Sequence, residues 1–239
     1  MGAYGPYTDY FVPHLSATAV IAALAYRRKT GKGQYIEISQ LEAGIHCLET
    51  AILDYTANGR EQSRMGNRHP QASPHGAYRS KGDDRWCAIA VFTDAEWQSF
   101  CRVLKNPRWS QDPRFATLSG RLENADELDR LVETWTLNYT PEKVMTLMQA
   151  AGVAAGVTQN SKDLHEDPQL KHRNHYWILN HPETGPSAYD SPAYKLSKTP
   201  SQPRMPAPCL GEHNEFVCTR LLGMSDEEFV GLMAEGVFD

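Results

Sequence analysis

The sequence lacks the marks of several protein classes. No run of about 18 apolar residues is present, so no transmembrane helix is predicted. The first ten residues, MGAYGPYTDY, lack the basic-then-apolar pattern of a signal peptide. The net charge is −5, without the basic excess that binds nucleic acid. We therefore expect a cytoplasmic protein with neither a membrane nor a nucleic-acid partner.

Metal-binding and disulfide patterns are missing as well. The five cysteines are odd in number and include no CxxC pair, which argues against a zinc site and a disulfide framework. Four histidines lie close in sequence, but their spacings match no standard ligand set: His165, His172, His175 and His181. No G-x-S-x-G nucleophile motif occurs. We therefore expect no metal site.

The composition is that of a globular protein. Hydrophobic residues make up 41% and charged residues 22% of 239 residues, enough chain for one large or two small domains. The N-terminal part predicts a helix from Pro13 to Lys29 that ends at Gly31, followed by a strand over Gln34–Ser39.

A capping box, Ser39-x-x-Glu42, then predicts one long helix that stops at Asn58-Gly59. Its apolar stripe is long enough to pack on another helix or on a subunit and consists of Leu41, Ile45, Leu48, Ile52 and Tyr55.

The middle of the chain reads as an α+β domain. It begins with a loop over Arg64–Gly76 and a hairpin around Lys81–Asp84, continues with helices capped at Thr93 and Thr140, and includes a strand at Val153–Val157. Two short helices and a second hairpin around Pro182–Gly185 follow. Residues 192–208 contain five prolines and predict an extended linker before two closing helices, the second capped by Ser225. We therefore predict three segments: 1–70, part of a larger domain; 71–190, a small α+β domain; and 191–239, linker and C-terminal helices.

Two polar features could carry chemistry. Thr30-Gly31-Lys32-Gly33-Gln34 has the composition of a phosphate loop, but it follows a helix and precedes a strand, so a helix-to-strand turn is the better interpretation. Asp9 lies just ahead of the first predicted helix, where the positive helix end would keep a carboxylate ionised. From the residues alone, Asp9 is either a helix cap or a nucleophile toward an activated acyl group.

The order of several motifs resembles the family III CoA-transferases, also called the CaiB/BaiF family. The resemblance rests on the following residues and motifs: Ala22-Ala23-Leu24, Arg27, Thr30–Gln34, Arg64-x-Gly66-Asn67, Pro74-x-Gly76-x-Tyr78, Asp112–Phe115, Arg121-x-x-Asn124, Ala151–Gly156, Asp167–Leu170 and Ala207–His213. Each motif is weak alone, but their order and spacing cover nearly the whole chain. An ungapped count back from Thr30-Gly31 places Asp9 on the family's catalytic aspartate.

The resemblance implies a mechanism and its participants. Asp9 would attack an acyl-CoA thioester and pass through an aspartyl-CoA thioester to a small carboxylic acid, with coenzyme A as substrate and no cofactor. By position, the family's mobile active-site loop corresponds to Gly66, Asn67, Arg68, His69, Pro70 and Gln71. The tetraglycine that some members carry there is missing.

The resemblance also implies the fold. It predicts an α/β protein with part of a Rossmann-like large domain and a small α+β domain, assembled as an interlocked dimer. Family members carry a long segment before the aspartate, whereas this sequence begins eight residues before Asp9. We therefore expect either a homodimer or a partner chain that supplies the N-terminal half.

Three functions fit these observations. The first is a CoA-transferase that works with a separately supplied N-terminal half. The second is an acyl-CoA racemase or isomerase of the same family, which needs a base partnered with the aspartate. The third is an inactive remnant or an interaction subunit.

Overall fold

The computed structural model describes residues 7–238. Contacts divide the chain into two compact units, Met1–Val157 and Thr158–Asp239. The predicted boundaries at 70 and 190 concern the family's domains and stay a prediction. Among the described residues, no helix is long and apolar enough to cross a membrane.

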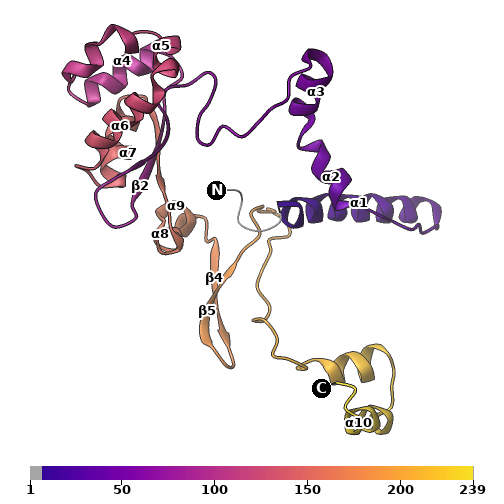
Figure 1. Cartoon of the computed structure of the whole chain (residues 1–239). Coiled ribbons are helices and arrows are strands. Elements are labelled where there is room, and N and C mark those ends of the chain that lie inside the picture. The colour runs from indigo at the N-terminus through magenta and orange to yellow at the C-terminus, as the bar shows by residue number, and fades with distance from the viewer. Residues whose placement is uncertain (1–6, 239) are drawn as a thin grey trace. The chain divides into compact units, whose positions relative to one another are not determined.

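The first unit begins with three helices (Figure 1): α1 (Tyr7–Thr30), α2 (Gln40–His46) and α3 (Glu49–Asn58). Helix α1 ends at Gly31 as predicted, because the backbone there adopts a φ of 75° that favours glycine. It begins at Tyr7 and not at Pro13, so the predicted start is wrong. A proline in the second turn removes only one helical hydrogen bond, and the helix continues through it.

Two further predictions are wrong in this region. Residues 34–39 form no strand, although the backbone of Ser39 is extended (φ −79°, ψ 125°). A strand needs a neighbour, and within residues 7–238 no strand pairs with this segment. The single long helix after Ser39 is divided into α2 and α3, because the backbone of Leu48 (φ −102°, ψ 7°) leaves the helical region. The predicted cap is present, since Ser39 accepts a hydrogen bond from the Glu42 amide at 3.3 Å.

A three-stranded sheet with helices on one face forms the rest of this unit. Strands β1 (His75–Arg79) and β2 (Trp86–Ala90) are the predicted hairpin, with Ala77 opposite Ala88, and β3 (Ala154–Thr158) lies beside β2. Four helices complete it: α4 (Asp94–Val103), α5 (Leu118–Glu123), α6 (Ala125–Thr136) and α7 (Pro141–Ala150). Helix α6 contacts β1 and α7 contacts β2.

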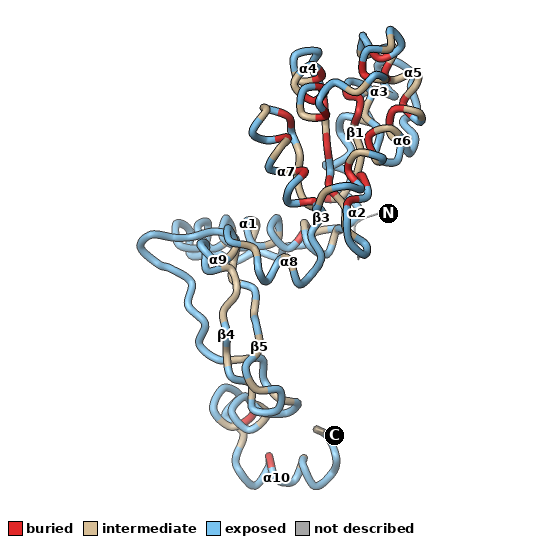
Figure 2. Tube along the Cα trace, turned by 90° about the vertical axis from the view of Figure 1, so that its left-hand side faces the viewer, coloured by how far each residue is buried: buried red, intermediate tan, exposed pale blue. Residues whose placement is uncertain are grey.

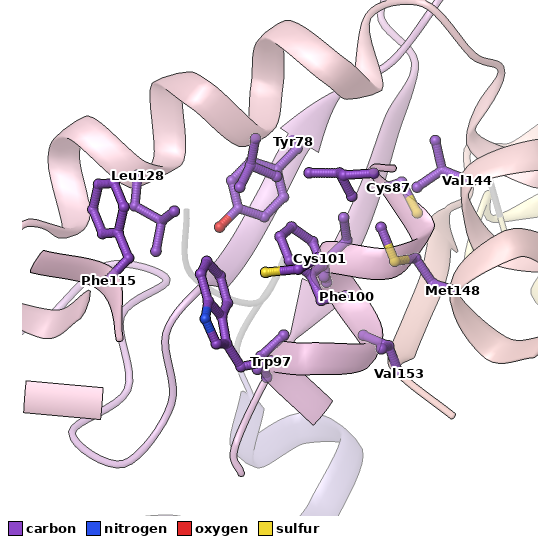
Figure 3. Packing of buried hydrophobic residues seen from close by; sticks show 14 residues of the cluster. Tyr78, Cys87, Trp97, Phe100, Cys101, Phe115, Leu128, Val144, Met148 and Val153 are labelled. Carbon is purple, nitrogen blue, oxygen red and sulfur yellow. The ribbon is translucent and has the colours of Figure 1, made fainter. Parts of the chain in front are cut away.

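The hydrophobic core lies between the sheet and these helices (Figure 3). Alternation along the strands turns Tyr78, Cys87 and Ile89 into the core. The intervening residues, including Ala77 and Ala88, lie on the opposite face of the sheet. Burial raises the pKa of the Cys87 and Cys101 thiols to about 11, so both remain protonated at neutral pH.

The second unit follows the predicted order closely. It contains α8 (Ser161–Glu166), α9 (Pro168–His172), the antiparallel hairpin β4 (Tyr176–His181) and β5 (Gly185–Asp190), a π-helical turn (Phe216–Leu221) and α10 (Asp226–Ala234). Residues 191–208 form no helix or strand, as the prolines predicted. Most residues of this unit are exposed (Figure 2).

A buried arginine joins separate parts of the first unit. The Arg121 side chain is fully buried; its guanidinium donates to the carbonyl of Ser73 at 2.9 Å and that of Phe115 at 3.2 Å. It also pairs with Asp94 at 3.1 Å and lies over the Trp97 ring at 4.8 Å. This one side chain of α5 therefore makes polar contacts with the chain before β1, with the turn before α5 and with the start of α4.

We expect Arg121→Met to destabilise the first unit by about 2–4 kcal/mol, because two buried carbonyls would lose their donor. Urea unfolding followed by tryptophan fluorescence measures this. The matched control is Arg102→Met, an exposed arginine of α4 whose guanidinium donates to Ser99 at 2.8 Å, for which we expect a change within about 0.5 kcal/mol. Equal effects of the two variants would contradict the structural role of Arg121.

Gly120 gives a second prediction. A Cβ at this position would lie 2.3 Å from the carbonyl oxygen of Arg114, so the backbone would have to move. We expect Gly120→Ala to cost about 1–3 kcal/mol despite the better helix propensity of alanine. Gly231→Ala in α10, where a Cβ meets nothing within 4 Å, should be neutral or stabilising in the same thermal-unfolding assay.

Candidate functional site

Asp9 lies in the first turn of α1 and is exposed. The side chain of Gln40, at the start of α2, donates to its Oδ1 at 3.0 Å. The carboxylate thus lies in the first turn of this 24-residue helix, beside the backbone N–H groups of the helix start. Because Pro13 has no N–H, the Asp9 carbonyl also lacks its usual helical donor four residues on. The structure thus places Asp9 as an accessible, oriented carboxylate.

The predicted loop, Gly66 to Gln71, is held against the sheet and α6. The Arg68 guanidinium bonds Asp126 and lies 3.5 Å from Asp129, both on α6. Gly66 has a φ of 62°, which turns the backbone at the start of the loop. Pro70 and Gln71 form the exposed turn closed by the bridge between His69 and Ala72.

Two histidines fix the other side of the loop. The Nδ1 of His75, the first residue of β1, lies 2.5 Å from the carbonyl oxygen of Asn67. Since a carbonyl can only accept, His75 carries its proton on Nδ1 in this contact. The His69 ring packs against His75 at 5.3 Å and against Phe92 at 5.4 Å, and its Nδ1 accepts from the Gln71 amide at 3.1 Å.

A groove of about 530 Å³ lies between this loop and the sheet face opposite the core. Its floor consists of small residues from all three strands, with Ile89: Gly76, Ala77, Ala88, Ala90, Ala154, Ala155 and Gly156. Gly66, Asn67, Arg68 and His75 form its polar end. This volume lies within the range of small-molecule sites.

A half-buried carboxylate, that of Asp129, connects the loop to the core. Tyr78 donates its hydroxyl to Asp129 Oδ1 at 2.7 Å, while Asp129 Oδ2 faces Arg68. Burial raises the pKa of the Asp129 carboxyl, against the lowering effects of the Tyr78 hydrogen bond and the Arg68 charge. Burial, and then the charge of Asp129, raise the pKa of Tyr78 far above its ordinary value. Tyr78 therefore stays protonated and acts as a donor.

The structure brings the residues of the predicted loop together but not with Asp9. Within residues 7–238, no hydrogen bond or ion pair joins Asp9 to residues 66–71. Sequence reasoning missed His75, Asp129 and Tyr78. The P-x-G-x-Y motif included Tyr78 and spanned His75, so this motif could have pointed to both residues. No motif of the sequence near Asp129 points to that residue.

The clustered histidines of the second unit have identifiable contacts. His165 stacks on Tyr176 at 4.2 Å, His175 packs edge-on against the same ring at 4.7 Å, and His181 accepts from the amides of the β4–β5 turn. Across the described part of the chain, no group of three or more potential ligands could hold a metal ion.

The family model for CoA-transferase family III matches residues 1–214, and the chain therefore belongs to this family. A probable CoA-transferase of Mycobacterium tuberculosis is 35% identical, covering 97% of this chain and 29% of the relative. The succinyl-CoA–D-citramalate CoA-transferase of Chloroflexus aurantiacus is 31% identical, covering 96% of this chain and 57% of the relative. The chain thus spans little more than half of these relatives, or less.

A solved structure shares the fold. The crystal structure of a CaiB/BaiF family protein from Brucella suis matches with a TM-score of 0.81 at 26% identity, covering 92% of this chain and 57% of that one. The mixed α/β architecture with small antiparallel sheets is therefore a family feature.

The anchoring of the loop can be tested at Asp129. We expect Asp129→Asn to leave global stability within about 1 kcal/mol, because the neutral amide avoids the cost of a buried charge and can still accept from Tyr78. It should accelerate hydrogen exchange of the loop amides about three- to tenfold, since Arg68 loses one of its two carboxylates. Hydrogen exchange with mass spectrometry measures both, with Glu123→Gln on α5 as the control; unchanged loop exchange would contradict the anchoring.

Proposed function

We propose that the chain is the nucleophile-bearing part of a CoA-transferase that moves coenzyme A from an acyl-CoA donor to a small carboxylic acid. The observation that carries the proposal is the family match over residues 1–214, together with an exposed, oriented Asp9 at the start of α1. Several relatives are named as CoA-transferases for D-citramalate, mesaconate or glutarate, which supports carboxylic acids as acceptors.

The first half of the proposed reaction releases the donor acid. An Asp9 oxygen attacks the thioester carbonyl carbon, the C–S bond breaks, and an acyl–aspartyl anhydride and the CoA thiolate form. The thiolate then attacks the Asp9 carbonyl carbon and displaces the donor acid, which leaves an aspartyl-CoA thioester. No net proton is consumed, because a carboxylate enters and a carboxylate leaves.

The second half runs in the opposite direction. The acceptor carboxylate attacks the aspartyl thioester carbonyl and displaces the CoA thiolate, which gives a new anhydride. The thiolate attacks the acceptor carbonyl, forms the new acyl-CoA and regenerates the Asp9 carboxylate. In this proposal neither a metal nor an organic cofactor takes part.

Developing negative charge on the attacked carbonyl needs hydrogen-bond donors. The Gln40 amide, which already donates to Asp9, and the free N–H groups of the first turn of α1 are the donors that lie nearest in the chain. We assign Gln40 the role of orienting Asp9 for attack.

We propose that a further polypeptide surface covers helices α1 to α3, as in the predicted interlocked dimer or with a separate N-terminal half. In α1 only Val12 is buried, and in α3 no residue is. The exposed apolar side chains include Ile21, Leu41, Leu48, Leu53 and Tyr55. An apolar surface of this kind is typical of a protein interface.

Covalent capture tests the proposal. The chain, alone and with a chain that supplies the preceding part of the family sequence, is incubated with succinyl-CoA and analysed by peptide mass spectrometry. We expect a CoA adduct on the peptide that contains Asp9. Asp9→Asn should abolish it, and the control Glu42→Gln, an exposed carboxylate of α2, should retain it.

Failure of every combination to form the adduct, with the chain folded, would contradict the proposal and favour the inactive remnant. Racemisation of a 2-methylacyl-CoA without acyl exchange would instead select the racemase.

A further inference from the structure

The groove on the open sheet face has two basic side chains at one end, of which Arg68 is also paired with Asp126 and Asp129 of α6. Its lining contains two ionisable side chains, Arg68 and His75, and both are basic. They lie at the same end, where the loop meets β1. The rest of the lining is apolar or small apart from Asn67, whose carbonyl bonds His75. An anionic group on a short apolar chain matches this arrangement.

The ring of His75 is oriented for recognition. Its Nδ1 proton is directed to the Asn67 carbonyl, which fixes the ring and leaves Nε2 as the nitrogen that can meet a ligand. When the imidazole is protonated, Nε2–H becomes a charged donor, and a carboxylate is the acceptor that such a donor binds most strongly. Arg68 is held by Asp126 and Asp129 through one nitrogen, Nη2, so its other donors remain for a second anion.

The floor of the groove lets the hydrocarbon chain of a ligand approach the backbone of the strands. Ala77 and Ala88 face each other across the β1–β2 ladder, and Gly156 lies on β3. A Cβ added at Gly156 would meet nothing within 4 Å, so the space above this strand is empty of protein. The small side chains therefore leave room for a few methylene groups.

We propose that this groove binds the chain of a short carboxylic acid, with His75 Nε2 and Arg68 holding its carboxylate and the Ala/Gly floor holding its methylenes. The inference rests on the proposed function in one respect: it identifies the acid bound in the groove as the acceptor of the proposed transfer. It makes His75 a specificity-determining residue of the small sheet, at a position that the P-x-G-x-Y motif spans without naming it.

Two substitutions at His75 separate recognition from a structural role. His75→Asn keeps a donor near the Nδ1 position for the Asn67 carbonyl but removes Nε2. His75→Gln instead places an amide near the Nε2 position. Recognition predicts at least tenfold weaker succinate binding for His75→Asn and a smaller loss for His75→Gln. A structural role predicts the reverse order.

The experiment follows the imidazole nitrogens of the full chain, labelled with ¹⁵N-histidine, during titration with succinate. We expect the His75 resonances to shift and the shift to saturate. Gly156→Val adds a β-compatible side chain over the floor and should abolish this shift. The resonances of the other histidines should remain as in the unsubstituted chain. The neutral four-carbon 1,4-butanediol should cause no shift.

Three outcomes would overturn the inference. The first is the lack of a His75 shift up to about 50 mM succinate, a concentration beyond the weak millimolar range. The second is an equal response to inorganic phosphate, which would show an anion site that does not select an acid chain, and the third is unaltered succinate binding to Gly156→Val. The assay contains no coenzyme A, so it does not depend on formation of the covalent adduct. A failed covalent capture with intact succinate binding would therefore reject the proposed function and not the groove.

Discussion

The buried guanidinium of Arg121 is the interaction on which the arrangement of the first unit depends. Burying an arginine is favourable only if its charge and its donors are matched. Here Asp94 supplies the charge, and the carbonyls of Ser73 and Phe115 take two further hydrogen bonds. The Ser73 hydroxyl in turn donates to the Arg121 carbonyl at 3.2 Å. The chain that leads into β1 is thereby fixed to α5.

This attachment has a consequence for the candidate site. Ser73 lies between the 66–71 loop and β1, so fixing it determines where the loop ends and where His75 begins the strand. From the other side, Arg68 ties the loop to α6 through Asp126 and Asp129. The loop that resembles the family's active-site loop is thus fixed within the loop by the pairing of Arg68 with carboxylates of α6 and just after the loop by hydrogen bonds between Arg121 and Ser73. A loop fixed in this way can present its backbone carbonyls and its side chains in one geometry.

The comparison with sequence reasoning separates local from non-local information. The cap at Thr93, the hairpin around Lys81–Asp84 and the proline-rich segment were predicted correctly, because each is decided by residues within a few positions of one another. The strand over 34–39 was wrong, because alternation makes a segment suitable for a sheet but cannot supply the neighbouring strand. The start of α1 was wrong because proline is favoured at the first helical position, whereas here the helix continues through Pro13 in its second turn with the loss of one hydrogen bond.

The same distinction explains what could be predicted of the site. Asp9 and the loop were predicted from motif order, which reports ancestry and not contacts, and they stay a prediction. The groove could not be found in this way, because its floor consists of alanines and glycines that look unremarkable in any one strand and become a surface only when β1, β2 and β3 are side by side. Its basic end depends on the Asn67–His75 contact, which spans the turn before β1. The groove therefore depends on strand pairing and on a contact across a turn, two kinds of information that no single motif contains.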